Sequence, residues 1–372
     1  MRFDFIFRRF PGPANRPADS KRRFLWGIQI MRGLAALMVV FGHILHEARN
    51  LEPDAGVANI LESLQLFPWG AVGVHIFFVI SGFVIVYTSP KMAGSLEGIK
   101  LFLLRRFTRV VPLYWFYTSL MILALFVVPA AIGTARIDWM HFLQSYLFIP
   151  HDRPAGGIRP VLSLGWTLNY EIYFYLVFGL FLCWGHRTAF ALLALFFVLT
   201  TALGFAAPES WSAIYFWTRP VVFAFLAGAG LAMLYLRDVV LPRIYFWPLM
   251  AAGMAILSLL IWPGREAFSD LAVMIAAGVI FLTAAGLTDQ KEHNRPPGIF
   301  AAMGNSSYSL YLSHPFILGL LQLAWVRLGL GDYLSIWIYV AGTVGLSVVG
   351  AHILYLLIER PMLRQLNRKL SL

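Results

Sequence analysis

The chain has 372 residues, of which 59% are hydrophobic and only 13% are charged, and its formal net charge is +11. Soluble globular domains carry about 25% charged residues, so this composition excludes an ordinary soluble enzyme. A single cysteine, Cys183, excludes an internal disulfide and a cysteine-based metal site. The sequence contains no phosphate-binding loop, dinucleotide fingerprint or zinc motif, and we expect no bound metal.

Ten apolar runs account for the composition, since each can cross the hydrocarbon core of a bilayer as a helix of about 20 residues. Backbone groups in lipid must be hydrogen-bonded within their own segment, which favours helices. We therefore predict an all-α, polytopic membrane protein with a cytoplasmic tail at 1–23, one membrane domain at 24–360 and a basic cytoplasmic tail at 361–372. The ten predicted spans are 24–47, 68–88, 110–130, 166–184, 188–207, 218–236, 244–262, 268–287, 304–326 and 334–357.

The basic residues alternate in number from one predicted loop to the next. With the N-terminus inside, 21 Lys and Arg fall in the inner segments and seven in the outer segments. This bias predicts that both termini are cytoplasmic, in the inner membrane. The net charge then reflects topology and attraction to anionic membrane lipid, and we expect no nucleic-acid partner.

The first run contains two ionisable residues, Arg32 and His43, which are eleven positions apart. Eleven residues bring them back to nearly the same helix face, about 16 Å apart along the axis. His46 and Glu47 can face the same way as His43 and orient its ring. The alternative is an arginine that extends to the headgroups and a histidine that is hydrogen-bonded within the bundle.

The second run contains His75 and Ser81 among glycines that favour close helix packing. Packing is the expected role of Ser81, and the role of His75 stays open.

Three arginines, Arg105, Arg106 and Arg109, precede the third run. Guanidinium groups are suited to bidentate binding of phosphate. The alternative is a basic flank that only sets the topology.

The fourth run opens with Trp166-Thr167-Leu168-Asn169-Tyr170-Glu171. A carboxylate at that depth needs a cation, a histidine, water or a substrate hydroxyl as its partner. The alternative is an acid near the start of a helix, where the helix dipole favours it.

The ninth run contains Tyr311, Ser313, His314 and Pro315. Pro315 has no N–H for the carbonyl of Tyr311 and is expected to kink the helix beside His314. The alternative is that the serines and the histidine hold neighbouring helices together.

These stretches together resemble the acyltransferase type 3 family of membrane sugar O-acyltransferases, and most closely exopolysaccharide O-acetyltransferases of the succinoglycan-modifying kind. The similar motifs are Arg32 with His43, 77–83, 105–115, 166–175 and 308–315. One departure is His75, where the family often has an acidic residue.

The resemblance implies acetyl-CoA as the acyl donor and a sugar hydroxyl of an exopolysaccharide or its lipid-linked precursor as the acceptor. We expect His43 to be the general base, because imidazole titrates near neutral pH, and Glu171 to orient it or compensate its charge. A transient acetyl-histidine stays open as a variant. The other site residues fall into three groups: Arg32, Arg105, Arg106 and Arg109 for the phosphates of CoA; Asn169, Tyr311 and His314 for the oxyanion; and Trp166, Arg219 and loop 131–165 for the sugar polymer or lipid-linked oligosaccharide.

Two other classes of protein also suit ten helices with buried polar residues. A transporter or flippase of a polysaccharide precursor or acyl group is the first, although neither an inverted repeat nor paired broken helices are visible. A scaffold within a polysaccharide-synthesis complex is the second, and it leaves Arg32 and Glu171 unexplained.

Overall fold

The computed structural model describes most of the chain, namely residues 8–9, 26–52, 54–127, 137–153, 156–237, 239–259, 270–283 and 298–370. The regular secondary structure of these residues is helical, apart from an antiparallel pairing of two short strands, β1 (Arg8–Arg9) and β2 (Val239–Val240). The predicted all-α class is confirmed.

Eight helical stretches in this part of the chain are long and apolar enough to cross a membrane. The predicted runs 244–262 and 268–287 contain shorter helices, α10 and α11, of 13 residues each, and the segments next to them lie outside the described residues. A polytopic membrane protein is therefore confirmed, with eight spans of full length where ten were predicted. The predicted tail 1–23 lies almost wholly outside the described residues.

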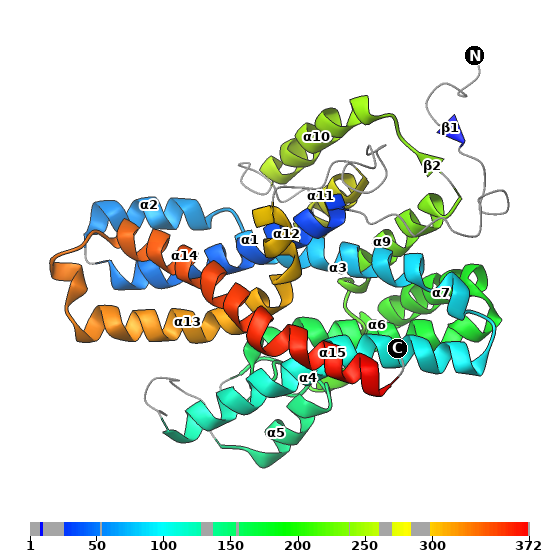
Figure 1. Cartoon of the computed structure of the whole chain (residues 1–372), viewed down its shortest axis with the longest axis horizontal. Coiled ribbons are helices and arrows are strands. Elements are labelled where there is room, and N and C mark those ends of the chain that lie inside the picture. Colours follow the sequence, from blue (N-terminus) through cyan, green and yellow to red (C-terminus); the bar gives the residue numbers. More distant parts are fainter. Residues whose placement is uncertain are drawn as a thin grey trace. The chain divides into compact units, whose positions relative to one another are not determined.

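The helices are shown in Figure 1 with the labels used below. Their bounds are α1 Trp26–Leu51, α2 Ala55–Gln65, α3 Trp69–Thr88, α4 Leu96–Val127, α5 Trp139–Tyr146, α6 Trp166–Phe181, α7 His186–Gly204, α8 Ser212–Trp217, α9 Val222–Tyr235, α10 Phe246–Ser258, α11 Asp270–Leu282, α12 Gly298–Asn305, α13 Ser307–Arg327, α14 Ile336–Leu354 and α15 Arg360–Lys369. Short 3₁₀ turns join several of them, and a π-helix, Tyr355–Glu359, joins α14 to α15.

The chain divides into two compact units. Unit 1 contains Met1–Tyr87 and Ala227–Tyr355, and unit 2 contains Thr88–Leu226 and Leu356–Leu372. Each unit is therefore built from segments that are distant in the sequence.

The core of unit 1 lies among α1, α2, α13 and α14, which pack on one another (Figure 1). Small and branched residues of α1 meet large residues of the other three helices. The buried members of this cluster are Ala36, Val40, Ile44, Leu45, Ala48, Leu61, Leu310, Leu318, Trp325, Ile336, Tyr339, Val340 and Ala351.

Glycines allow the closest helix contacts in unit 1. A Cβ on Gly228 of α9 would lie 1.8 Å from the Val79 carbonyl oxygen of α3, and one on Gly304 of α12 would lie 2.3 Å from the Gln29 carbonyl oxygen of α1. No larger residue fits at either position without moving a backbone. Small residues at such contacts are typical of helices that associate in lipid.

Unit 2 is held largely by aromatic rings of α4, α6 and α7. The Phe174 ring of α6 stacks on Phe225 at 4.9 Å between centroids and also lies near Phe178 and Phe197. Aromatic pairs of this kind add about 0.5–1.5 kcal/mol each beyond the area that they bury. The α6 helix, which carries Glu171, is therefore firmly placed within unit 2.

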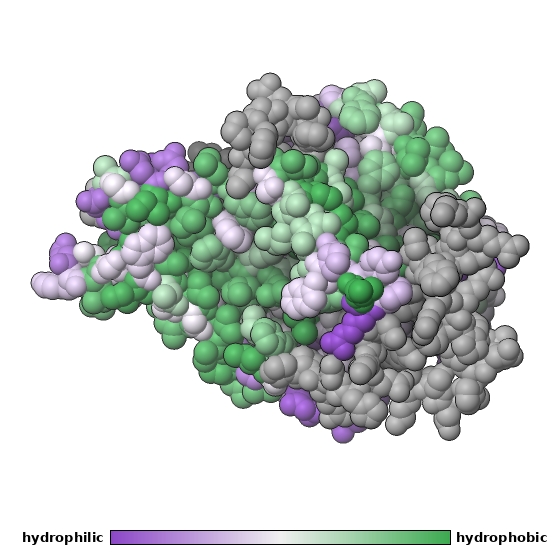
Figure 2. Space-filling model, turned by 90° about the horizontal axis from the view of Figure 1, so that it is seen from above, coloured by the Kyte–Doolittle hydropathy of each residue, from purple (hydrophilic) through white to green (hydrophobic). Residues whose placement is uncertain are grey.

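Large hydrophobic side chains cover much of the visible face in Figure 2. On α7, for example, Leu195, Val198, Leu199 and Leu203 are all at least half exposed. Exposed apolar surface of this extent is unusual for a soluble monomer. This exposed apolar surface is what we expect of helices whose outer faces contact lipid.

Candidate functional site

The α1 and α13 helices of unit 1 share a series of polar contacts, which we call the α1–α13 seam. Three pairs define it: Arg32 with Ser307, His43 with His314, and Glu47 with Gln322. The numbers rise together on both helices, so the two helices run parallel. From Arg32 to Glu47 the seam extends about 22 Å along α1, which is most of the thickness of a bilayer core.

The two histidines are the centre of the seam. His43 Nδ1 lies 3.3 Å from His314 Nε2, and their ring centroids are 5.1 Å apart. His314 is fully buried, whereas the His43 side chain is exposed. The buried His314 ring thus lies against the exposed His43 ring and helps to hold it in place.

Backbone carbonyls set the proton positions on both rings. His43 Nδ1 is 2.9 Å from the Val39 carbonyl oxygen, and His314 Nδ1 is 3.2 Å from that of Leu310. A carbonyl only accepts, so each neutral ring carries its proton on Nδ1 and a lone pair on Nε2. His43 Nδ1–H can therefore also donate to His314 Nε2, and His43 Nε2 is the basic atom.

Pro315 contributes to the placement of His314. It lies inside α13 and has no N–H for the carbonyl of Tyr311. The His314 ring interacts with this carbonyl as well as with that of Leu310. The predicted link between the proline and the histidine next to it therefore has a structural basis.

Arg32 begins the seam at its other end. Its guanidinium donates to Ser307 Oγ at 3.1 Å and to Gln29 Oε1 at 3.4 Å, and the side chain is half-buried. These partners are neutral, so the positive charge is not balanced by them.

In unit 2, Glu171 and Arg106 belong to one network, which we call the α4–α6 network. Tyr175 donates a hydrogen bond to Glu171 Oε1, and the carboxylate also interacts electrostatically with Arg106. Arg106 donates to Thr88 Oγ1 and lies over the Phe102 ring at 5.8 Å. Glu171 was predicted to assist His43. Tyr175 and Arg106 lie in the same unit as Glu171, and the pairing with His43 stays a prediction.

The arginine cluster divides by exposure. Arg106 is only 9% exposed, whereas Arg105 is exposed and Arg109 is half-buried. Arg105 and Arg109 are one turn apart on α4 and are accessible to an anion. Arg106 belongs to the α4–α6 network, because its side chain points about 100° away from that of Arg105, toward the interior of the unit.

The remaining predicted residues differ in their surroundings. Asn169 is 2% exposed and its Oδ1 has no hydrogen-bond partner among the described residues, while Trp166 is half-buried with its ring 6.0 Å from that of Tyr170. Tyr311, 5% exposed, packs against Phe77 and His314. Arg219 donates to the carbonyls of Tyr215 and Gly204, and its guanidinium stacks on the Tyr215 ring. The sugar contact predicted for Arg219 would compete with these local bonds.

The predicted acceptor loop 131–165 is partly described and contains α5. His141 of α5 is buried, and its Nε2–H donates to the Arg159 carbonyl at 2.9 Å. Burial lowers the pKa of His141 below its ordinary value of 6.5, and His151 and Arg153 lower it further, while Arg159 and Asp138 act in the opposite direction. The loop is therefore held by a neutral histidine.

Sequence reasoning missed the partners Ser307, Gln322, Thr88 and Tyr175. Tyr175 follows Glu171 by four residues, a spacing that could have indicated the contact. The other three approach from segments distant in the sequence and gave no local signal. Within the described residues, no group of three or more His, Cys, Asp or Glu side chains is placed to hold a metal ion.

Several known proteins are similar to this chain. The exopolysaccharide production protein ExoZ of Rhizobium meliloti is 31% identical over 304 aligned positions, which cover 80% of this chain and 91% of ExoZ. Nodulation protein 10 of Rhizobium leguminosarum bv. viciae is 25% identical, with 95% and 96% covered. The peptidoglycan O-acetyltransferase OatA of Listeria monocytogenes is 28% identical over 45% of this chain and 25% of OatA. No solved structure matches.

Residues 25–356 match the family described as acyltransferase domain, Acyl_transf_3. This match covers almost all of the predicted membrane domain and contains every residue of the α1–α13 seam and the α4–α6 network. It decides between the enzyme and the alternatives of a transporter, flippase or scaffold. The chain belongs to this acyltransferase family and is a multi-pass membrane enzyme.

Proposed function

We propose that the protein is a membrane O-acetyltransferase that moves an acetyl group from acetyl-CoA to a sugar hydroxyl of an exopolysaccharide or its lipid-linked precursor. The similarity to ExoZ and to OatA supports the polysaccharide and the acetyl group. The observation that carries the chemistry is the hydrogen-bonded pair of His43 and His314. The His43 imidazole is exposed, and the Val39 carbonyl and His314 fix its tautomer. Such a ring is suited to general-base catalysis.

In the proposed reaction, His43 Nε2 takes the proton of the sugar hydroxyl while the hydroxyl oxygen attacks the thioester carbonyl. The carbon–sulfur bond breaks, and the CoA thiolate leaves and receives the proton from the imidazolium. His314 stays neutral and keeps the His43 ring in position through Nδ1. A relay through acetyl-His43 uses the same nitrogen and is the alternative order of steps.

For the donor, we propose that Arg105 and Arg109 bind phosphates of acetyl-CoA, because both are accessible and carry a guanidinium. Arg32 is a further candidate, because it also carries a guanidinium and is half-buried. We assign Arg106 to the α4–α6 network and not to the phosphates. Binding of the oxyanion is the role that we propose for Tyr311, which packs against His314 in unit 1.

We also propose that the enzyme lies in the inner membrane with both termini cytoplasmic, as the charge bias favours. Single cysteines placed at Ser63 and Leu370, in a background in which Cys183 is replaced, test the orientation with a membrane-impermeant thiol reagent. We expect labelling from outside at position 63 only. Labelling at position 370 instead would reverse the topology.

The deciding experiment is an assay of the purified protein with acetyl-CoA and de-O-acetylated exopolysaccharide. We expect release of CoA together with incorporation of acetyl ester into the polymer. Absence of both, in a preparation that is folded and monodisperse, would contradict the proposed function.

A further inference from the structure

We propose that Glu47 and Gln322 form the binding site for the acceptor sugar, next to His43. This inference rests on the proposed function and names the residues that would select the acceptor. It concerns the third pair of the α1–α13 seam, to which the mechanism above gives no role.

The pair lies close to the proposed base. Glu47 follows His43 by four residues, so it is on the same face of α1 and about 6 Å farther along its axis. Gln322 Nε2 donates to Glu47 Oε2 at 2.8 Å, and both side chains are half-buried. A ligand can therefore reach the pair and His43 on one face of the helix.

The hydrogen-bonding groups of this pair match those of a sugar. A carboxylate offers about four acceptor positions and the Gln amide has a second N–H and an acceptor oxygen, so their mutual bond uses only part of this capacity. A carboxylate accepts from hydroxyl groups and an amide N–H donates to hydroxyl oxygens. Neighbouring hydroxyls of one sugar ring present both at once.

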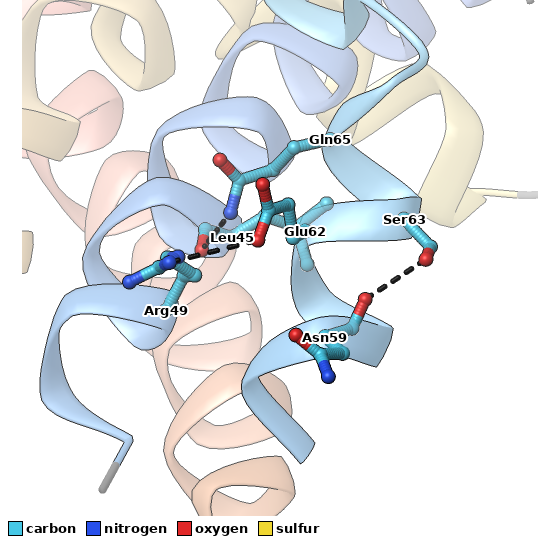
Figure 3. A network of polar contacts seen from close by, with 6 residues as sticks. All are labelled: Leu45, Arg49, Asn59, Glu62, Ser63 and Gln65. Atoms are coloured by element: carbon cyan, nitrogen blue, oxygen red, sulfur yellow. Dashed lines mark hydrogen bonds and ion pairs between the residues drawn. The ribbon is translucent and has the colours of Figure 1, made fainter. Parts of the chain in front are cut away.

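The negative charge of the Glu47 carboxylate is also available to interact with a ligand. Arg49, the nearest cation on α1, pairs with Glu62 of α2 at 3.5 Å instead (Figure 3). Gln65 of α2 donates to the Leu45 carbonyl at 2.9 Å, which fixes this end of α1 against α2. Within the part of the chain that the structure describes, the Glu47 carboxylate is thus held by Gln322 and forms no salt bridge.

An aromatic surface lies behind the pair. Tyr339 of α14 interacts electrostatically with Glu47, and its ring packs edge-on against Trp325 at 5.2 Å. Both rings are buried, at 4% and 7% exposure. They support the helix faces that carry Glu47 and Gln322, so these side chains are positioned before the sugar arrives.

The test compares Glu47→Gln with the matched control Arg49→Gln. Glu47→Gln keeps the size of the side chain and can still bond to Gln322, but it removes the charge. We expect it to raise the KM for de-O-acetylated exopolysaccharide oligosaccharides about 10-fold or more. The KM for acetyl-CoA and the Tm should stay the same, and Arg49→Gln should change neither of these quantities nor the KM for the oligosaccharides.

The double variant Glu47→Gln with Gln322→Glu separates a binding role from a packing role. It keeps a carboxylate–amide hydrogen bond with its direction reversed, so Tm should again equal the wild-type value while the acceptor KM stays raised. Recovery of the wild-type acceptor KM would overturn the proposal. An unchanged acceptor KM in Glu47→Gln would overturn it as well.

Direct binding of the same oligosaccharides, measured by the intrinsic tryptophan fluorescence of the detergent-solubilised protein, needs no turnover. Equal affinity of wild type and Glu47→Gln would contradict the proposal even if the protein were inactive with acetyl-CoA. A second outcome is that Glu47→Gln loses affinity for the oligosaccharides while the wild-type protein does not use acetyl-CoA at all. That outcome would contradict the proposed function but would support the proposed sugar site.

Discussion

In unit 1, Arg32 and Glu47 of α1 hydrogen-bond to neutral side chains of α13, whereas in unit 2 the ionisable side chains of α4 and α6 interact with one another. Arg32 bonds to a serine and Glu47 to a glutamine, but Arg106 and Glu171 are opposite charges within one network. A charge inside a membrane protein is costly unless it is compensated. The α4–α6 network brings opposite charges together, whereas Arg32 and Glu47 of the α1–α13 seam contact neutral side chains of α13.

This comparison indicates how to separate functional from structural polar residues in this protein. Substitutions in the seam should change kinetic constants at nearly constant stability. Substitutions in the network should lower stability first. Each prediction below tests one side of that contrast.

The largest effect is expected for His43→Ala. Loss of a general base lowers the rate about 10²–10⁴-fold, and the exposed position of His43 should leave folding intact. Steady-state acetyl transfer with acetyl-CoA and the deacetylated polymer measures the effect, and Tm and CoA binding serve as controls. A variant that acetylates at nearly the wild-type rate would end this mechanism and direct attention to His314 or His75.

His314→Ala should have the next largest effect, about 10²-fold in kcat, since a misplaced catalytic group can cost that much. The variant removes one of the two acceptors near His43 Nδ1–H and leaves only the Val39 carbonyl, so the pH profile of kcat should shift as well. His314→Gln can still accept this bond and should recover part of the rate. If both variants lower Tm and leave the pH profile unchanged, His314 is only a packing residue.

Arg106→Ala should destabilise unit 2 by about 1.5–3 kcal/mol, which is the range for a hydrogen bond to a charged group. The substitution removes the bond to Thr88 and leaves the Glu171 carboxylate without its cation. Thermal unfolding in detergent measures the loss. Glu171→Gln in the same background should recover part of it, because the unbalanced charge is then gone.

Arg105→Ala and Arg109→Ala should weaken the binding of acetyl-CoA by about 1–3 kcal/mol each at an unchanged Tm. Equilibrium binding of CoA is the measurement, and dephospho-CoA is a matched ligand that lacks one phosphate. If the variant with both Arg105→Ala and Arg109→Ala binds CoA normally and Arg106→Ala does not, Arg106 binds the phosphates and the other two arginines do not.

The smallest effect concerns the α5 loop and pH. The pKa of His141 is held below 6.5 by burial, so the unfolded chain binds the proton more readily than the fold does. Stability is therefore complete above about pH 6.5 and declines as the pH falls, by at most about 1.4 kcal/mol per pH unit. His141→Gln should flatten this decline between pH 8 and pH 5, as measured by Tm. A decline of the same slope in the variant would assign it to other groups.

The sequence predicted the membrane helices well, because a run of about 20 apolar residues has few other stable arrangements. It also predicted which of the rare polar residues to consider, including His43 and His314. It did not predict that these two meet, since 271 residues separate them and no local pattern reports such a contact. The pairing of Glu171 with His43 stays a prediction, and the structure shows a contact of Glu171 with Tyr175, four residues away.

The arginine cluster shows a different limit. Three closely spaced arginines, Arg105, Arg106 and Arg109, resemble a uniform basic flank in the sequence. In the helix, however, the Arg106 side chain points toward the interior of unit 2. The burial of Arg106 depends on Thr88 and Phe102, which the packing of unit 2 brings to it. Helical spacing placed Arg105 and Arg109 on one face, and packing decided the role of the third.

The parallel pairing of α1 with α13 has a consequence for biosynthesis. The residues of its three pairs are 271 or 275 positions apart in the chain. At about 5–20 residues per second, a ribosome needs about 14–55 s to make the intervening segment. During that time Arg32, His43 and Glu47 have already been delivered to the membrane without their α13 partners. Water, lipid headgroups or the insertion machinery must satisfy these groups until α13 arrives, so assembly of the His43–His314 pair is among the last events of folding.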